Sequence, residues 1–270
     1  MKNQSFIVSQ KQREIFSKNL KKYVDEKGLT QKELADLFGV STSAFNDWMK
    51  AKKYPRIDKI ELMANYFGIS KSDLIEDQTE KKTEEVNDSK SKIEKLLKET
   101  YRAGMNDLLA WMDEAGFYNA PCSGKYHLAK PGGLAEHSLN VLAIATQLYA
   151  SKFAGESNIQ SFCFYDSIVI CSLLHDLGKA GQFEKPNYIA NEDSGGYHTN
   201  KELLYVPHEV RSVAIASRFI ELTEEEQFAI LQHNGMYGEL KNSLAGKETP
   251  LQMILHFSDM WASRVVEKEG

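Results

Sequence analysis

The stretch Ser167-Ile168-Val169-Ile170-Cys171-Ser172-Leu173-Leu174-His175-Asp176-Leu177-Gly178-Lys179 joins an apolar run directly to a histidine, an aspartate and a lysine. The run 167–174 is the longest apolar run of the chain, and we expect it to lie in a buried helix. A carboxylate such as Asp176 beside so apolar a segment is unfavourable unless it is paired or binds a metal. Imidazole nitrogens bind borderline metal ions, and a carboxylate can bridge two ions, so the pair His175-Asp176 indicates a metal site.

Further candidate ligands lie on both sides of this stretch. They are His137 upstream and His208, His233 and Asp259 downstream. The histidines fall in or at the end of separate predicted helices, and Asp259 lies inside an apolar helix, where an unpaired carboxylate is costly. A set of His and Asp residues that converge from separate helices is what a site for two metal ions requires.

The hydrophobic pattern around these residues is that of helices, and we predict an all-α fold. Helices are expected from residue 92 onward and over 134–148, 165–177, 206–220, 223–233 and 250–266. Thr223 and Glu226 form a capping box, and Pro250 suits a first helical turn. The Gly/Asn/Pro-rich stretch 181–205 is long for a connection, which is typical of functional loops, and a small hairpin is expected near 197–206.

The chain of 270 residues is long enough for two domains. We predict a first domain at 1–77 and a second domain at 92–270. The stretch 78–91 between them holds Val86 as its single apolar residue, so we expect a solvated linker there or the frayed start of a helix. Residues 1–77 carry 14 basic and 11 acidic residues, a balance of +3, whereas the whole chain carries -5, so the remainder carries -8. This asymmetry suggests different partners for the two parts.

Cysteine usage and the absence of long apolar runs indicate a cytoplasmic protein. Cys122, Cys163 and Cys171 form no CxxC pair, and an odd count argues against a disulfide framework. The first 16 residues lack the apolar run of a signal peptide, and no stretch reaches the length of a membrane span. We therefore expect reduced thiols and no membrane partner.

Residues 30–53, TQKELADLFGVSTSAFNDWMKAKK, predict two short helices joined by a tight turn. Thr30 and Glu33 make a capping box, Gly39 ends the first helix, and Ser41 can cap the second. This is the helix-turn-helix pattern, in which the second helix enters the major groove of DNA.

From about residue 16 to 76 the chain resembles the Xre/Cro family of DNA-binding domains, which implies a small five-helix unit. The matching residues are Thr30-Gln31-Lys32-Glu33-Leu34-Ala35, Gly39-Val40-Ser41, Trp48, Pro55 and the run 60–69. The resemblance implies that Gln31, Ser41, Thr42, Ser43 and Asn46 face DNA and that Lys50, Lys52 and Lys53 contact phosphates. Asp47 stands where such domains often carry a basic residue. We expect a homodimer on a two-fold DNA site; a module for dimerisation or protein contact is the alternative.

The second part resembles the HD-domain superfamily of metal-dependent phosphohydrolases. Its motifs are Gly132-Gly133-Leu134-Ala135-Glu136-His137, then Leu173-Leu174-His175-Asp176-Leu177-Gly178-Lys179, and finally His256-Phe257-Ser258-Asp259. The first and last motifs are also similar to the HD domain of a bacterial 3′–5′ exoribonuclease family. The segment 117–127, with Lys125-Tyr126-His127, is similar to HD proteins common in phages and prophages.

The resemblance implies a ligand set of His137, His175, Asp176 and Asp259 for one metal, and His208 and His233 match the additional histidines of dinuclear members. We therefore expect two divalent transition metal ions, with Mn, Fe, Ni, Co and Zn not distinguished. The stretch 233–238 lacks the GYP tripeptide of the HD-GYP phosphodiesterases. Asp176 would bridge the ions, which activate water for attack on phosphorus. Lys179 would steady a phosphate oxygen; a role at the helix C-terminus is its alternative.

The two resemblances together imply a metal-dependent phosphoric ester hydrolase acting on a nucleotide or a nucleic acid and carrying a DNA-binding helix-turn-helix. The alternative is a transcriptional regulator whose second domain binds a nucleotide without hydrolysing it. A pure sensor has little use for six metal-ligating side chains and Lys179, all of which this chain has.

Overall fold

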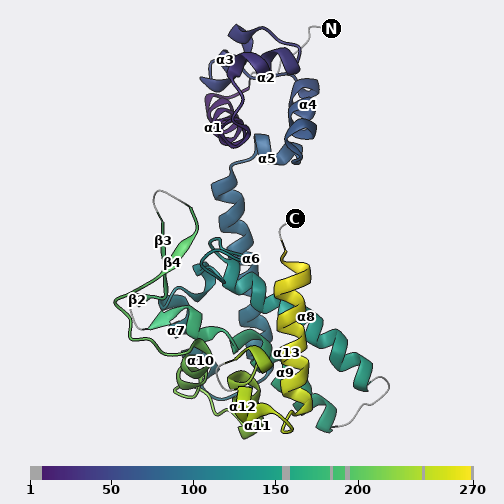
Figure 1. The fold of residues 1–270 in the computed structure, drawn as a ribbon, viewed down its shortest axis with the longest axis vertical. Coiled ribbons are helices and arrows are strands. Elements are labelled where there is room, and N and C mark those ends of the chain that lie inside the picture. Colours follow the sequence, from purple (N-terminus) through teal and green to yellow (C-terminus); the bar gives the residue numbers. More distant parts are fainter. Residues whose placement is uncertain (1–7, 154–158, 183–184, 192–194, 239–240, 269–270) are drawn as a thin grey trace. The chain divides into compact units, whose positions relative to one another are not determined.

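The computed structural model describes the backbone of residues 8–153, 159–182, 185–191, 195–238 and 241–268, and the side chains of these residues except 79–82, 152–153 and 159–163. The chain divides into two units, unit 1 at Met1–Glu84 and unit 2 at Glu85–Gly270. Within the described residues the fold is all-α apart from two short hairpins, as predicted (Figure 1). None of the helices in that part of the chain is both long and apolar enough to cross a membrane.

Unit 1 has the five-helix arrangement expected from the sequence. Its helices are α1 (Gln10–Lys27), α2 (Gln31–Leu37), α3 (Thr42–Met49), α4 (Ile57–Phe67) and α5 (Lys71–Ile75). Aromatic side chains contribute strongly to its core: Phe38 makes ring contacts with Phe45, Tyr66 and Phe67. Burial of such large rings is the main source of stability for so small a unit.

Helices α2 and α3 begin and end where the sequence predicts. The Thr30 backbone N–H donates to the Glu33 carboxylate at 2.8 Å, and the Thr30 hydroxyl accepts from the Glu33 N–H at 3.3 Å, so the capping box is present. Gly39 follows the cap residue of α2 with a φ of 61°, a left-handed conformation that favours glycine. The Ser41 hydroxyl accepts from the Ala44 N–H at 3.1 Å and caps α3.

Residues 78–91, predicted to be a solvated linker or the frayed start of a helix, lie within helix α6 (Gln78–Glu99). Oppositely charged pairs four residues apart explain the helix, for example Lys92 with Asp88 at 2.6 Å and Lys98 with Glu94 at 3.3 Å. Val86, the single apolar residue of that stretch, packs against the core of unit 2. The division between the two units falls inside this helix, after Glu84.

A break separates α6 from α7 (Met105–Glu114), although the apolar spacing runs on without a gap. Tyr101 has a φ of 52° and is 91% exposed, and Gly104 has a φ of 83°. A Cβ at Gly104 would lie 1.8 Å from the Phe219 carbonyl oxygen, so the chain turns here against a distant segment. The hydrophobic pattern of the sequence cannot predict this contact, because it joins two segments that are far apart in the chain.

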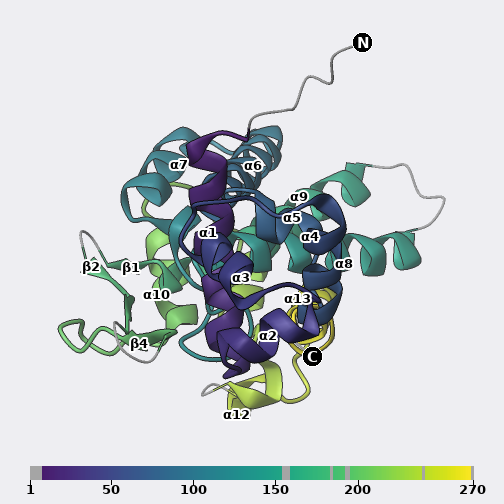
Figure 2. The ribbon, with the colours of Figure 1, turned by 90° about the horizontal axis from the view of Figure 1, so that it is seen from above.

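Three helices form the centre of unit 2: α8 (Gly133–Phe153), α9 (Ile159–Leu174) and α13 (Pro250–Trp261). They pack on one another and carry many of the buried aliphatic side chains, and Figures 1 and 2 both draw them side by side. The surrounding elements are η1 (Phe117–Asn119), η2 (Leu177–Lys179), α10 (His208–Ala216), α11 (Glu224–Leu231), η3 (Gly235–Tyr237), α12 (Lys241–Leu244) and the π-helical turn η4 (Ala262–Val266).

Several expected helix boundaries differ from the structure, and two of these differences lie at the candidate site. The helix predicted over 165–177 ends at Leu174, so His175 and Asp176 lie in the turn before η2. The helix predicted to begin at residue 206 begins at His208, because Pro207 has non-helical backbone angles and occupies the N-cap. The predicted capping box of α11, Thr223 with Glu226, is present.

The hairpin expected near 197–206 lies elsewhere. Strand β3 (Tyr188–Ala190) pairs with β4 (Tyr197–Thr199), and β1 (Gly181–Gln182) pairs with β2 (Lys185–Pro186), both antiparallel. The tyrosine at 197 is the start of a return strand, not of the first strand, and residues 200–206 form an irregular segment. Alternation of apolar residues indicates a strand, but it does not indicate which other strand pairs with it.

We expect Glu226→Gln to destabilise the protein by about 1.5–3 kcal/mol at neutral pH, because a charge-assisted hydrogen-bond pair is lost. Glu226 is buried and accepts from both terminal nitrogens of Arg102, at 3.0 and 2.8 Å, and from Ser167 at 2.8 Å. Burial raises the pKa of Glu226, but the hydrogen bonds from Arg102 lower it below its ordinary value of 4.5.

The sign of this pKa shift defines the measurement. A lowered folded-state pKa stabilises the protein above the unfolded value, and the stabilisation is lost as pH falls through the folded value. The difference in free energy of unfolding between wild type and Glu226→Gln, measured in urea, is therefore expected to be largest near neutral pH. It should shrink as pH falls below 4.5. If this difference in free energy stayed constant across that pH range, the stabilisation by Glu226 would not come from its charge.

Candidate metal centre

His137 lies in the second turn of α8, and the start of this helix sets its position. A Cβ at Gly133 would lie 2.1 Å from the Leu128 carbonyl oxygen, so only glycine lets the helix begin against the preceding loop. The His137 side chain is fully buried and enters the space between α8 and α13. The Gly132-Gly133 pair of the first motif therefore serves to place His137.

Asp176 lies at the centre of the candidate site, and each of its oxygens faces a pair of histidines. Asp176 Oδ2 is 3.6 Å from His137 Nε2 and 3.4 Å from His175 Nε2. Asp176 Oδ1 is 3.2 Å from His208 Nε2 and 3.7 Å from His233 Nε2. The carboxylate thus has one imidazole pair on each side, the arrangement in which a carboxylate bridges two ions.

The other ring nitrogen of each histidine already has an oxygen partner. His175 Nδ1 donates to the Ser172 carbonyl at 2.9 Å, and His233 Nδ1 donates to the Ile230 carbonyl at 2.7 Å. His137 Nδ1 lies 3.0 Å from the Glu267 carboxylate, and His208 Nδ1 lies 3.2 Å from Glu209. Because these partners hold the Nδ1 side of each ring, all four rings direct Nε2 toward Asp176.

The Nε2 atoms within each histidine pair also lie close to one another. His137 Nε2 and His175 Nε2 are 3.3 Å apart, and so are His208 Nε2 and His233 Nε2. Asp176 Oδ1 is buried, and no described group donates a hydrogen bond of good geometry to it. Imidazole nitrogens and carboxylate oxygens suit divalent transition ions, so the residues present fit the metal pair that the sequence implies.

Burial and neighbouring charges shift the pKa values of several groups at the site. Burial and the neighbouring His175 lower the pKa of His233 to about 3, which keeps its ring in the neutral, metal-binding form. Burial lowers the pKa of His137, but the negative groups around it, among them Cys122 and Asp259, raise it well above its ordinary value. Burial raises the pKa of Asp176, yet Lys179 and His175 hold it well below its ordinary value.

The two remaining predicted site residues also lie here. Asp259 Oδ1, from α13, is 3.2 Å from His137 Nε2. Lys179, from η2, places its ammonium 2.6 Å from Asp176 Oδ2. All six predicted ligands and Lys179 are therefore brought together, and their roles in binding and catalysis stay a prediction.

Gly178 explains how α10 reaches the site. A Cβ at Gly178 would lie 2.3 Å from the His208 carbonyl oxygen and 2.9 Å from Arg211 Cβ. The Gly178 N–H donates to the Ser212 hydroxyl at 2.8 Å, which fastens η2 to α10. The glycine of the second motif thus lets α10 approach closely enough for His208 to face Asp176.

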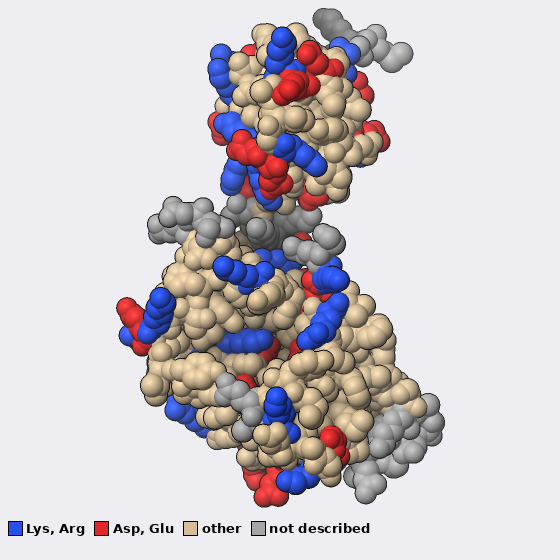
Figure 3. Space-filling model, in the orientation of Figure 1, with Lys and Arg blue, Asp and Glu red and all other residues tan. Residues whose placement is uncertain are grey.

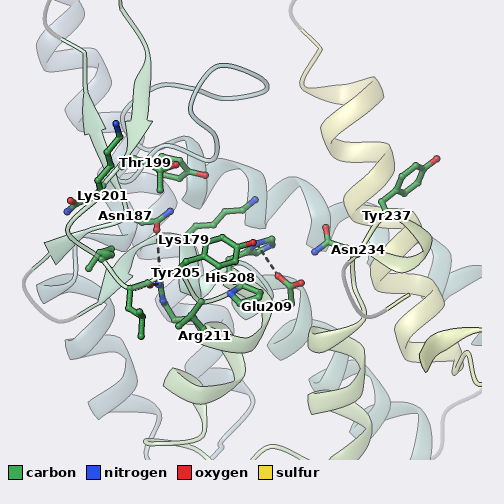
Figure 4. A pocket seen from close by; sticks show the side chains of 17 residues that line it. Lys179, Asn187, Thr199, Lys201, Tyr205, His208, Glu209, Arg211, Asn234 and Tyr237 are labelled. Carbon is green, nitrogen blue, oxygen red and sulfur yellow. Dashed lines mark hydrogen bonds and ion pairs between the residues drawn. The ribbon is translucent and has the colours of Figure 1, made fainter. Parts of the chain in front are cut away.

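A cavity of about 500 Å³ opens beside the site. Its lining includes Lys179 and His208 together with Tyr205, Asn234 and Tyr237, which Figure 4 labels. Figure 3 shows basic and acidic side chains together inside a hollow on this face of unit 2. The stretch 181–205, predicted to be a functional loop, supplies one wall of the cavity through Asn187 and Thr199.

Three residues next to His137 were not predicted to belong to the site. Glu267 holds His137 Nδ1, and Cys122 and His127 lie beside that histidine, with Cys122 Sγ 3.3 Å from His127 Nε2. Burial raises the pKa of Cys122, but the charge of His137 lowers it to about 6. The sequence offers no signal for Glu267, which stands among charged residues at 267–269; a C-x₄-H spacing was the available signal for the other two.

Other histidines and cysteines fall into simpler roles. His198 is exposed on β4 and hydrogen-bonds to Asn191 at 2.7 Å. His256 Nδ1 donates to the His233 carbonyl at 2.8 Å, and so it supports the turn that carries His233. Cys122 and Cys171 are free thiols, as predicted, and the side chain of Cys163 lies outside the described residues.

In unit 1 most of the residues predicted to face DNA are exposed on α2 and α3. Gln31, Thr42, Ser43 and Lys50 are exposed, and Asn46 is half-buried. Ser41 is exposed, but its hydroxyl is occupied as the cap of α3. Asp47 pairs with Lys53 at 2.8 Å, which offsets its negative charge and engages one of the lysines expected to contact phosphate.

Comparisons with known proteins also divide the chain into two domains. Residues 20–74 match a helix-turn-helix family model, and residues 134–260 match the HD domain model. The solution structure of the SOS-response transcriptional repressor LexA from Eubacterium rectale is 47% identical, covering 27% of this chain and 77% of that chain, with a TM-score of 0.25. A search of curated proteins gives no match. The chain therefore carries an N-terminal helix-turn-helix domain and a C-terminal HD domain.

Proposed function

We propose that this protein is a metal-dependent phosphohydrolase that cleaves a phosphoric ester of a nucleotide or a nucleic acid. One observation carries the proposal: the two oxygens of buried Asp176 each face a pair of imidazole Nε2 atoms, within 3.2 to 3.7 Å. The match of residues 134–260 to the HD domain supports the same chemistry.

His137, His175 and Asp259 would hold one ion, His208 and His233 the other, with Asp176 shared between them. When bound, such ions supply positive charge to phosphoryl oxygens and lower the pKa of water. The chain's own contribution is to orient the ligands: Ser172, Ile230, Glu209 and Glu267 hold the Nδ1 atoms, so that every Nε2 points inward. Prearranged ligands of this kind reduce the reorganisation needed during the reaction.

Lys179 is placed to donate to the phosphate. Its ammonium lies beside Asp176 and also lines the cavity, so a substrate phosphate that enters there meets both the lysine and the histidine pair. The interaction with Asp176, although opposed by burial, raises the pKa of Lys179 well above its ordinary value and keeps the donor charged at neutral pH. Tyr205 and Tyr237 are 76% and 70% exposed at the cavity, where their rings could stack on a nucleobase.

The direct test is to remove bound metal with a chelator and then to restore Mn²⁺, Co²⁺ or Zn²⁺ one at a time. Nucleotides, cyclic nucleotides and short RNA or DNA are then screened for release of phosphate or nucleotide. Activity that disappears on chelation and returns with metal is expected. Binding of a nucleotide with no turnover under any metal would favour the sensor instead.

The helix-turn-helix domain supports a second element of the proposal, that unit 1 binds duplex DNA through α2 and α3. We expect Lys50→Ala to weaken binding to a mixed-sequence duplex and to lower the salt slope of log K by about one unit, because one phosphate contact is lost. Fluorescence anisotropy at several salt concentrations measures this slope. Lys247→Ala, an exposed lysine of unit 2, serves as the control, and equal slopes for both variants would argue against a role for Lys50.

A further inference from the structure

Two cavities of unit 2 approach the candidate metal centre from different sides. The first cavity, of about 500 Å³, reaches the centre at His208. The second cavity, of about 720 Å³, reaches the Glu267 carboxylate, which lies 3.0 Å from His137 Nδ1. His208 faces one oxygen of Asp176 and His137 faces the other, so the metal centre lies between the two cavities.

The side chains of Tyr237 and Arg264 join the two cavities. Tyr237 lines the first cavity and Arg264 lines the second, and the Arg264 guanidinium carbon is 4.9 Å from the centre of the Tyr237 ring. This distance is that of a cation–π contact. Figure 4 shows Tyr237 at the end of the first cavity away from Lys201. The two cavities are therefore neighbours, and one elongated ligand can extend from the first into the second.

Basic side chains gather in both cavities, although this part of the chain is acidic. Residues 78–270 carry a net charge of -8, the difference between -5 for the whole chain and +3 for residues 1–77. Among the described residues that line it, each cavity nevertheless has three basic side chains and one acidic side chain. The acidic ones, Glu209 and Glu267, each lie against a histidine of the metal centre. The basic ones therefore give both cavities a positive charge that suits phosphate groups; they are Lys179, Lys201 and Arg211 in the first cavity and Lys125, Arg264 and Lys268 in the second.

Exposed tyrosines accompany these basic side chains. Tyr205 and Tyr237 of the first cavity are 76% and 70% exposed, and Tyr126 of the second cavity is 86% exposed. The Tyr126 backbone N–H donates to the Ser123 hydroxyl at 3.0 Å, which holds the loop that carries this ring. Aromatic rings beside basic side chains are the surface on which the bases of a single strand stack.

We propose that unit 2 binds a single-stranded nucleic acid across both cavities, with one of its phosphates at the metal centre. The inference rests on the proposed function and names the substrate class of that site. A mononucleotide occupies the first cavity alone and makes no contact with Tyr126 or Arg264. A duplex does not suit the cavities, because its bases are stacked on one another and cannot stack on tyrosine rings.

Binding without turnover tests this inference independently of hydrolysis. A fluorescein-labelled single-stranded RNA of about 12 nucleotides, within the range of known single-strand sites, is titrated with full-length protein in the presence of a chelator. Unlabelled RNA, DNA of the same sequence and a nucleoside monophosphate are then added as competitors, and fluorescence anisotropy reports displacement. We expect the preferred strand, RNA or DNA, to compete at least ~10-fold better than the mononucleotide.

Tyr126→Ala and Arg264→Ala are each expected to weaken binding of the labelled RNA by about tenfold, because a stacking ring or a phosphate contact is lost. Tyr126→Phe keeps the ring and should bind like wild type. Tyr101→Ala is the matched control for the tyrosine, since Tyr101 is 91% exposed and lies outside both cavities. Lys247→Ala is the control for the loss of one positive charge. Neither control should change the affinity.

Equal competition by the mononucleotide and both strands, or wild-type affinity in both Tyr126→Ala and Arg264→Ala, would overturn the inference. An equal loss of affinity in Lys50→Ala and Arg264→Ala would also overturn it, because the RNA would then be bound by unit 1. The proposed function fails in a different way. Strand binding with these variant effects but no hydrolysis with any metal would disprove the hydrolase alone, whereas hydrolysis of mononucleotides without preferential strand binding would disprove this inference alone.

Discussion

Asp176→Asn is expected to reduce hydrolysis by at least ~10³-fold and to deplete bound metal. The substitution keeps the shape of the side chain but removes the charge and one of the two oxygens that face the histidine pairs. The ions' stabilisation of the transition state amounts to several kcal/mol, and about 4 kcal/mol corresponds to a factor of ~10³. Initial rates with a cleaved substrate and metal content by mass spectrometry measure the two effects.

Loss of folding must be separated from loss of the site. The neutral amide of Asp176→Asn would leave the Lys179 ammonium, which lies 2.6 Å from the wild-type carboxylate, without its charged partner. The double variant Asp176→Asn with Lys179→Met removes that unpaired charge and is expected to unfold at a temperature close to wild type while staying inactive. Asp107→Asn, an exposed aspartate on α7, is the matched control with full activity. Hydrolysis within a few-fold of wild type in Asp176→Asn would refute the proposed centre.

Gly178→Ala is expected to destabilise the protein by about 1–3 kcal/mol and to lower activity by ~10²-fold. The added methyl would lie 2.3 Å from the His208 carbonyl oxygen and 3.0 Å from the Ser212 nitrogen, both backbone atoms that no rotamer change can move. Helix α10 must therefore shift away from η2, and His208 moves from its 3.2 Å approach to Asp176.

Chemical denaturation and rate measurements on the same preparation test this expectation. Gly238→Ala provides the control: its φ of -74° suits alanine, and an added Cβ would meet nothing nearer than 3.1 Å. We expect a much smaller change there. If Gly178→Ala keeps both wild-type stability and wild-type activity, close packing of α10 is not what positions His208.

Much of the site is predictable because its parts are local signals. His175-Asp176 directly follows an apolar helix, and His137 follows two glycines at a helix start. Burying a polar side chain in an apolar segment is unfavourable unless that side chain has a partner such as a metal ion. These positions can therefore be recognised in the sequence. The helix-turn-helix is equally local, since Thr30, Glu33 and Ser41 cap helices within three residues of themselves.

The conformation of 78–91 and the position of the hairpin both depend on contacts that the sequence pattern does not show. Charge composition left a solvated linker and a helix open for 78–91; pairs such as Lys92 with Asp88 act along a helix, and Val86 packs against the core of unit 2. The hairpin depends on β3 pairing with β4, and the strand period alone does not choose a partner.

The amino-acid sequence by itself determined that this protein has two helical parts, a helix-turn-helix and a set of six His and Asp residues suited to metal. Only the tertiary structure decided which atoms of those residues meet. Glu267 contacts His137 across 130 positions of sequence. Helical periodicity sets which face of a helix is buried, but contacts between distant helices arise only when their side chains pack together.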